Sequence, residues 1–306
     1  MTTTIATTAI AENIVNDNSL ITIKETKKAI KTKKTETEKA EVPKKARKPR
    51  VVKPKGNIVI ENQNSFDINK RFEFVKKLVK MVASGIQASA IITGEGGVGK
   101  TFTVTKTLEE MGYKNICASS DSTFDSTDMD KYFIAVKGHS TAKGLYRTLF
   151  ENRKAIVIFD DCDSVLKDPI SLNILKSALD SYSKRTISWN ADMRDEDLPR
   201  SFNFEGGVIF ISNIEQNKLA QSIRSRSMMI DLSMTIDQKI ERMGFIVKTD
   251  EFLPEYSKSI KKDALNLISD IKDEIKDINL RTLITVCKVR ASNEDYKELA
   301  IYMLTM

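Results

Sequence analysis

The sequence predicts an α/β protein in which a parallel sheet is flanked by helices, followed by a small all-helical domain and preceded by a disordered basic arm. Three observations predict this class. Residues 1–55 concentrate positive charge and contain no aromatic residue. Short apolar runs then alternate with amphipathic segments, and from about Thr235 onward these runs stop. Short apolar strands separated by helices are typical of parallel sheets that are covered on both faces.

The predicted arm comprises residues 1–55. The chain has 306 residues and a net charge of +7, and the arm holds 14 Lys and Arg against 6 Asp and Glu. Residues 56–306 hold 35 against 36, so the excess charge belongs to the arm. A segment of this charge with three prolines and no aromatic residue buries too little apolar surface to offset the entropy of ordering it. We therefore expect order to begin near Ile58.

Composition also excludes several classes of protein. No apolar run approaches the roughly 18 residues that a membrane-spanning helix needs. No Lys or Arg precedes Lys24, which is unlike a secretory signal. The three scattered cysteines argue against a disulfide framework, and the single His139 excludes a two-histidine metal motif. We expect a cytoplasmic protein in a reducing compartment, with no membrane partner.

The elements expected between residues 56 and 233 follow from apolar periodicity. Residues 68–84 place Phe72, Val75, Leu78 and Val82 at helical spacing. Apolar runs predict strands, and the amphipathic segments between them predict helices. The expected strands are 89–93, 132–136, 155–159, 207–211 and 228–232, and the further helices are 101–111, 141–152, 170–182 and 218–223. Together they predict an α/β nucleotide-binding domain over residues 56–233.

Residues 234–306 show only helical patterns. Ala264, Leu267, Ile268 and Ile271 recur at helical spacing, and a second such series begins at Leu280. We expect a separate, all-helical C-terminal domain here.

A glycine-rich segment follows the first expected strand and opens a helix. Residues 94–101 read GEGGVGKT and match the phosphate-binding pattern GxxxxGK[ST]. The glycines let backbone N–H groups turn toward an anion, Lys100 reaches the β- and γ-phosphates, and Thr101 offers a hydroxyl to Mg²⁺. A plain glycine turn between a strand and a helix is the alternative. The candidate nucleotide-binding residues are Gly94, Glu95, Gly96, Gly97, Val98, Gly99, Lys100, Thr101 and Phe102.

Two carboxylates end a later apolar strand. The run Ile156–Phe159 is followed by Asp160 and Asp161, sixty residues after Lys100. An aspartate at such a strand end holds Mg²⁺ in phosphate-loop enzymes, and the next acid orients the attacking water. We therefore expect Asp160 and Thr101 to hold Mg²⁺ and Asp161 to orient the attacking water. The alternative is that the two acids have no function, since such pairs also follow strands in other proteins.

Three further segments carry a resemblance to a known family. VIFISN ends at Asn213, IRSR contains Arg224 and Arg226, and NLRT contains Arg281. With the two motifs above, and in the same order, these segments resemble those of the AAA+ ATPases from about Ile58 to the C-terminus. The resemblance implies ATP and Mg²⁺ as cofactors, and a helical lid over residues 234–306. It also implies that Asn213 positions the lytic water and that Arg281 acts as sensor 2.

The resemblance further implies an arginine finger, which reaches the nucleotide of a neighbouring subunit. A homo-oligomer, as a ring or spiral, follows from it. The Ser-Arg pattern favours Arg226 as the finger, and Arg224 is then a structural or second finger; a solvated charge at a helix end is the alternative for each. The DDCD segment at 160–163 also resembles uncharacterised AAA-type ATPases of large tailed bacteriophages. If the chain is phage-encoded, its place is the host cytoplasm.

Some residues depart from the family's pattern. Most active members carry Asp-Glu where this chain has Asp160-Asp161, and the shorter side chain suggests slow turnover. The stretch Val136–His139 has the glycine of a pore loop without its aromatic residue, which counts against a processive protein unfoldase. Trp189 projects toward a pore or packs in the core, and core packing is favoured.

The predicted chemistry is ATP hydrolysis coupled to movement between the sheet domain and the helical domain. The basic arm suggests a nucleic-acid or nucleoprotein substrate, because lysines that neutralise phosphates release counterions. The arm has no aromatic residue to stack on bases and is equally well interpreted as a nonspecific tether. The alternatives are a motor that remodels an unidentified partner protein and a slowly hydrolysing, nucleotide-gated assembly switch.

Overall fold

A computed structural model describes residues 66–116, 131–190 and 198–306. All of them belong to one compact unit, Ile58–Met306. The predicted arm of residues 1–55 and the expected start of order near Ile58 lie outside the described residues. The domain boundaries at 55/56 and 233/234 stay predictions. Among the described residues, no helix combines the length and apolarity that crossing a bilayer requires.

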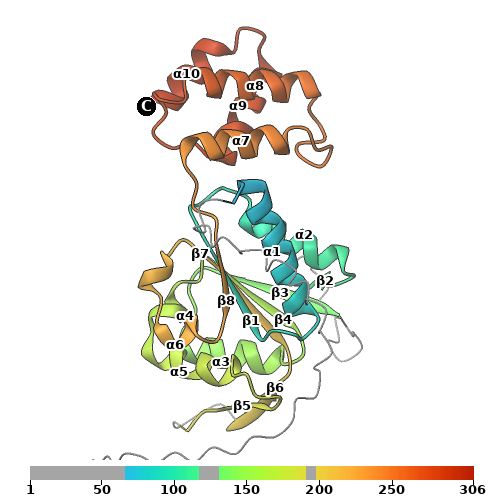
Figure 1. Ribbon diagram of the computed structural model, residues 1–306, viewed down its shortest axis with the longest axis vertical. Helices are drawn as coiled ribbons and strands as arrows, with labels where there is room; N and C mark the ends of the chain where they lie inside the picture. The colour runs from blue at the N-terminus through green and yellow to red at the C-terminus, as the bar shows by residue number, and fades with distance from the viewer. Residues whose placement is uncertain (1–65, 117–130, 191–197) are drawn as a thin grey trace, which may run out of the picture. The chain divides into compact units, whose positions relative to one another are not determined.

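The centre of the unit is a six-stranded sheet of order β2-β3-β4-β7-β1-β8, and every neighbouring pair runs parallel (Figure 1). Its strands are β1 (Ser89–Thr93), β2 (Lys114–Asn115), β3 (Tyr132–Lys137), β4 (Ile156–Asp160), β7 (Gly207–Ser212) and β8 (Met228–Asp231). The five predicted strands and their parallel arrangement are confirmed. The sequence did not predict β2, because two residues carry no periodicity.

Successive residues of the central strands face opposite sides of the sheet, as the period of two requires. In β4, Ile156 and Ile158 join one buried cluster, whereas Val157 and Phe159 join the other. Helices α1 (Ile68–Ala83) and α2 (Lys100–Glu110) cover the first side. Helices α3 (Ala142–Glu151), α4 (Ser164–Lys167), α5 (Pro169–Ala178) and α6 (Gln221–Arg224) cover the second. Helices on both faces explain why the strands are apolar throughout.

The segment after β4 differs from the prediction. The expected helix over 170–182 ends at Ala178, and its start is fixed by Asp168, whose carboxylate accepts the Ser171 N–H at 2.7 Å. An antiparallel pair follows, β5 (Arg185–Ser188) with β6 (Ser201–Phe204), which the sequence did not predict. Trp189, directly after β5, is half-buried and lies 5.6 Å from the Tyr146 ring. Core packing of Trp189 is therefore confirmed.

The segment before β8 contains a single-turn 3₁₀ helix (Gln216–Lys218) and then α6, where one short helix over 218–223 was expected. After β8 the chain is helical, as predicted. Helices α7 (Ile236–Ile246), α8 (Lys258–Asp270), α9 (Leu280–Ser292) and α10 (Lys297–Thr305) share a third buried cluster of apolar side chains. Thr235 begins this region with a capping box to Gln238, in which each side chain accepts the backbone N–H of the other residue.

Candidate active site

The glycine-rich segment joins the carboxyl end of β1 to the start of α2. Gly94 has φ +135°, and a Cβ there would lie 2.9 Å from the Leu232 carbonyl carbon, so only glycine fits. Gly99, at φ +95°, precedes α2 and has no side chain to cap it. The first N–H groups of α2 are therefore left for an anion, as at other helix starts that bind phosphate.

Lys100 crosses this segment from the first turn of α2. Its side chain is buried, with 6 % of the residue exposed. Its Nζ donates to the Gly94 carbonyl at 2.6 Å, the Glu95 carbonyl at 2.8 Å and Asn213 Oδ1 at 2.7 Å. Burial lowers the pKa of Lys100, and the nearby Asp161, Asp160 and Asp163 oppose that shift. The ammonium thus lies where its own loop meets the end of β7.

Thr101 and Asp160 form the next contact. The Thr101 hydroxyl donates to Asp160 Oδ1 at 2.9 Å, and the Asp160 side chain is only 8 % exposed. A hydroxyl and a carboxylate are hard oxygen ligands of the kind that suit Mg²⁺, which is usually held by one or two carboxylates together with phosphates and water. Within the described ranges, no group of three or more His, Cys, Asp or Glu residues could hold a metal ion by itself. The residues present therefore fit a metal that is shared with phosphate oxygens.

Asp161 and Asn213 meet beside this pair. Asn213 Nδ2 donates to Asp161 Oδ1 at 3.0 Å, and both residues are exposed. Asp161 has φ +51°, a conformation that aspartate tolerates better than most residues. Behind them, the Ser212 hydroxyl donates to Asp163 Oδ1 at 2.7 Å, so Asp163 ties the ends of β4 and β7 together. The structure thus brings Lys100, Thr101, Asp160, Asp161 and Asn213 together at one edge of the sheet.

Arg281 joins them from α9. The Leu280 N–H donates to the Gly97 carbonyl at 2.9 Å, which holds the start of α9 against the glycine-rich segment. The Arg281 guanidinium lies close enough that a Cβ on Gly96 would be 3.8 Å from its Nη1. A cavity of about 220 Å³ lies between these elements. Its lining comprises Gly96, Gly97, Val98, Gly99, Lys100, Thr101, Phe102, Asp160, Asp161, Ile211, Asn213, Leu280 and Arg281.

Two lysines at the site were missed by sequence reasoning. Lys137 ends β3 and lies opposite Asp160 in the strand register, with its Nζ 3.5 Å from Asp160 Oδ2. Lys137 ends the strand that pairs with β4, and this position could have indicated from the sequence that it lies near Asp160. Lys239 of α7 forms an ion pair with Glu95, and its side chain is nearly buried. Nothing in the sequence pairs these two residues, because they are 144 positions apart.

Arg224 and Arg226 are not brought to this cavity. The Arg226 carbonyl accepts from Ser89 Oγ at 3.3 Å, at the start of β1, whereas the glycine-rich segment follows the end of that strand. The Arg226 guanidinium is half-buried and donates to the Ser222 carbonyl at 3.0 Å. Arg224 is exposed and makes no side-chain hydrogen bond or ion pair with the described residues. Both arginines therefore lie at the opposite edge of the sheet.

Residues 90–232 match the protein-family model of the ATPase family associated with various cellular activities (AAA). This part of the chain is an AAA ATPase domain. The AAA domain therefore contains β1, the glycine-rich segment, the carboxyl ends of β4 and β7, and the arginines Arg224 and Arg226. An AAA domain binds nucleotide and hydrolyses ATP. Helices α7 to α10, with Arg281, follow the matched residues.

A relative is also found in a bacteriophage. The chain is 26 % identical over 238 residues to an uncharacterised 36.7 kDa protein from the nrdC-mobD intergenic region of enterobacteria phage T4. The alignment covers 71 % of this chain and 68 % of the phage protein.

Replacing Gly97 tests the contact between the AAA domain and α9. Gly97 has φ +73°, and a Cβ there would lie 3.0 Å from Asn279 Oδ1. We expect Gly97→Ala to lower the stability by about 1–2 kcal/mol, since an L side chain is strained at this φ. We also expect it to weaken binding of an ATP analogue, because Asn279 and Leu280 must move away from the loop. Thermal unfolding and a binding titration measure the two effects.

Gly112→Ala is the matched control. Gly112 has φ +83°, and a Cβ there would meet no atom within 4 Å. It should lose comparable stability and keep the affinity for the analogue. Equal affinities in the two variants would show that the contact with α9 does not matter for binding.

Proposed function

We propose that this chain is a motor that binds ATP with Mg²⁺ between the AAA domain and α9 and hydrolyses it within an assembly of several copies. Its work is the remodelling of a nucleic-acid or nucleoprotein substrate in the cytoplasm, the host cytoplasm if the chain is phage-encoded. The observation that carries the proposal is the convergence of Lys100, Thr101, Asp160, Asp161 and Asn213 at the carboxyl edge of a parallel sheet. Ligands of open α/β sheets bind at that edge.

The phosphates are bound by the glycine-rich segment and two cations. In this proposal the backbone N–H groups at the start of α2 contact the phosphate oxygens, and Lys100 leaves the carbonyls of Gly94 and Glu95 to reach the β- and γ-phosphates. Arg281 approaches from α9 and neutralises part of the same charge. Thr101 and Asp160 hold Mg²⁺, which when bound neutralises charge that develops on the phosphates.

The attacking water is oriented by Asp161 and Asn213. Their side chains are hydrogen-bonded and exposed beside Lys100, so a water can reach both. Asp161 accepts a proton from the water, and Asn213 fixes the carboxylate that does so. Because Asp161 is one methylene shorter than the usual glutamate, the water has to lie closer to β4. This favours slow turnover, and it keeps the nucleotide-gated assembly switch as the second candidate function.

The neighbouring copy supplies the arginine. Arg224 and Arg226 lie at the edge opposite their own glycine-rich segment, so neither completes the site of its own copy. The Ser-Arg pattern favours Arg226 as the arginine finger. The structure favours Arg224, because its side chain is exposed, whereas the Arg226 guanidinium is bonded to the Ser222 carbonyl. We assign the finger to Arg224 and the bracing of its turn to Arg226. We propose that α7 to α10 act as a lid that moves with the nucleotide through the Leu280–Gly97 and Lys239–Glu95 contacts.

Measuring steady-state ATP hydrolysis with and without DNA tests the proposed nucleic-acid substrate. We expect DNA to stimulate hydrolysis by the full chain, and we expect a variant reduced to residues 56–306 to lose this stimulation while it keeps the basal rate. A basal turnover number well below about 1 s⁻¹ would support the slow chemistry expected of Asp161. Hydrolysis that ignores DNA in both proteins would contradict the nucleic-acid substrate. Tight ATP binding with almost no turnover would favour the switch.

A further inference from the structure

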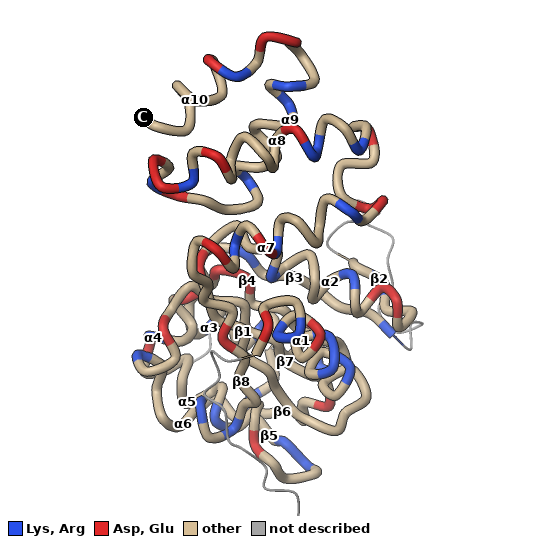
Figure 2. The backbone as a smooth tube through the Cα atoms, turned by 45° about the horizontal axis from the view of Figure 1, so that its top comes forward, with Lys and Arg blue, Asp and Glu red and all other residues tan. Residues whose placement is uncertain are grey.

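The outer face of α1 combines lysine and phenylalanine side chains. The inner side of this helix packs on the sheet through Ile68, Phe72, Val75, Leu78, Val79 and Val82. With about 3.6 residues per turn, the positions between these buried residues share one outward face. The following residues, on or directly before the helix, are what we call the α1 basic face: Phe66, Lys70, Phe74, Lys76, Lys77 and Lys80. Its four lysines are exposed, and Figure 2 shows blue segments along α1.

Much of the positive charge on this face has no acidic partner. Glu73 is the only carboxylate within α1, and it pairs with Lys70 at 2.7 Å. Lys76, Lys77 and Lys80 form no ion pair with any residue that the structure describes. A rise of about 1.5 Å per residue spreads the lysines over roughly 15 Å. This length matches about four steps of a nucleic-acid strand, so the face can meet a short row of phosphates.

Two aromatic rings lie among these lysines. Phe66 is 42 % exposed, and its ring meets the half-buried Phe74 ring edge to face, with the centroids 5.3 Å apart. The Nζ atoms of Lys70 and Lys77 lie 6.0 and 5.9 Å from the Phe74 centroid. A lysine-rich face that meets only water needs no phenylalanine. Rings beside cations suit an unpaired nucleic-acid strand, because bases stack on the rings while the phosphates meet the charges.

The inner side of α1 fixes this face in place. Arg71 is 4 % exposed and donates to the carbonyls of Asp231 at 3.3 Å and of Ser233 at 2.9 Å, where β8 ends. The Arg242 guanidinium of α7 lies 3.8 Å from the centroid of the Phe72 ring. A strand on the outer face would therefore be bound by a helix whose other side contacts both the sheet and α7.

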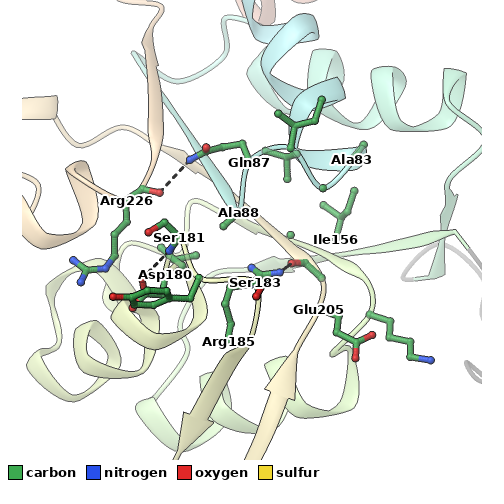
Figure 3. Close-up of a pocket in the computed structure, with 18 of the residues that line it drawn as sticks. Ala83, Gln87, Ala88, Ile156, Asp180, Ser181, Ser183, Arg185, Glu205 and Arg226 are labelled. Atoms are coloured by element: carbon green, nitrogen blue, oxygen red, sulfur yellow. Dashed lines mark hydrogen bonds between the residues drawn. The ribbon is translucent and has the colours of Figure 1, made fainter.

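A second basic surface is less suited to phosphates. A cavity of about 790 Å³ opens beside the end of α1, at the amino-terminal edge of the sheet (Figure 3). Lys154, Arg185 and Arg226 line it, and both guanidiniums already donate to main-chain carbonyls. Asp180 and Glu205 line it as well, and their carboxylates repel phosphates. The unpaired lysines of α1 are therefore the better phosphate ligands.

We infer that the α1 basic face binds single-stranded nucleic acid, with bases stacked on Phe66 and Phe74 and phosphates at Lys76, Lys77 and Lys80. The inference rests on the proposed function, since it names the folded surface that holds the proposed substrate. A duplex fits less well, because its bases stack on one another and are not free to stack on the rings. The basic arm has no aromatic residue, so the stacking falls to this face.

Binding of a fluorescent oligothymidine to the full chain, measured by anisotropy at several salt concentrations, tests the lysines. We expect the triple variant Lys76→Ser, Lys77→Ser, Lys80→Ser to bind at least tenfold more weakly. The slope of log affinity against log salt should fall by about two, since each phosphate contact on a single strand contributes about 0.7. The melting temperature and the basal ATP hydrolysis should stay unchanged, because the three side chains are exposed and none lines the nucleotide cavity.

An equal loss of charge elsewhere is the matched control. Lys262, Lys288 and Lys297 are exposed on α8, α9 and α10 and form no ion pair with the described residues. Replacing all three by serine should leave the affinity and the salt slope as in the wild type.

Phe66→Ala tests the stacking separately from the charge. We expect it to weaken binding of the oligothymidine at least about fivefold, the loss of one stacked base, and to leave the salt slope unchanged. Phe245→Ala is its control, since Phe245 is 50 % exposed on α7 and lies outside the α1 basic face. It should bind the strand as the wild type does.

The contrary outcomes separate the inference from the proposed function. Wild-type affinity and slope in the triple variant would overturn the inference and leave the proposed function standing, with the arm as the binding segment. Equal competition by a duplex of the same length, or by polyglutamate, would overturn the stacked single strand. If the unaltered full chain binds no oligothymidine even at low salt, both the inference and the nucleic-acid substrate are wrong.

Discussion

Lys100→Ala is expected to reduce ATP hydrolysis by at least about 100-fold, the largest loss from one side chain of the loop. The ammonium is buried and makes three hydrogen bonds, to Gly94, Glu95 and Asn213. In the proposed reaction the ammonium stabilises the negative charge that develops on the γ-phosphate. Electrostatic stabilisation of this kind typically increases the rate by factors of about 10² to 10³. The rate of phosphate release under saturating ATP measures the loss.

Lys106→Ala is the matched control for this prediction. Lys106 lies further along α2, is about one-third exposed and pairs with Glu251 at 3.0 Å. Its loss removes one surface ion pair, which contributes little to stability. We expect a nearly normal rate. If Lys100→Ala hydrolyses ATP as fast as Lys106→Ala does, the assignment of the phosphate loop is wrong.

Arg224→Ala is expected to reduce hydrolysis by about 10³-fold, the lower end of the range for arginine fingers. Arg224 is exposed and unbonded among the described residues, so we expect neither the melting temperature nor ATP binding to change. Because the arginine acts on a neighbour, mixing this variant with Lys100→Ala should restore part of the activity. A mixed interface is intact where the phosphate loop comes from the Arg224→Ala copy and the arginine comes from the Lys100→Ala copy.

Arg226→Ala separates the two candidates for the finger. Its guanidinium donates to the Ser222 carbonyl at 3.0 Å, and its Nε is buried without a partner among the described residues. We expect this variant to lose stability and to keep most of its rate per assembled copy. A full loss of turnover in Arg226→Ala, with normal turnover in Arg224→Ala, would return the finger to Arg226. Activity that mixing cannot restore would show that the arginine acts within one copy.

Much of the fold could be predicted because its signals are local. The strands β1, β4 and β7 are continuous apolar runs, and a strand that is buried on both faces requires such a run. The segment from Gly94 to Thr101 is recognisable because a tight phosphate loop needs glycines at fixed positions. Strands β2, β5 and β6 were missed, because segments of two to four residues are too short to show a periodicity.

The candidate site also has a part that the sequence predicts and a part that only the tertiary structure creates. The residue types at 100, 101, 160 and 161 were predicted from motifs, since each type serves the chemistry of one phosphate group, one metal ion or one water. The role of Asn213 was predicted from the family resemblance. The contacts of Lys137 with Asp160 and of Lys239 with Glu95 were not predicted, because strand register and helix docking create them. The choice between Arg224 and Arg226 also depends on which guanidinium the turn leaves exposed.

The sequence alone determined the class of fold and the chemistry of the nucleotide site, since periodicity and residue type act over a few neighbouring positions. Only the tertiary structure decided which distant groups meet. It placed Arg281 beside Gly96, separated the arginines of α6 and its following turn from their own loop, and left one side of α10 exposed. The first two of these facts depend on the packing of segments more than a hundred residues apart, and no local pattern encodes that distance.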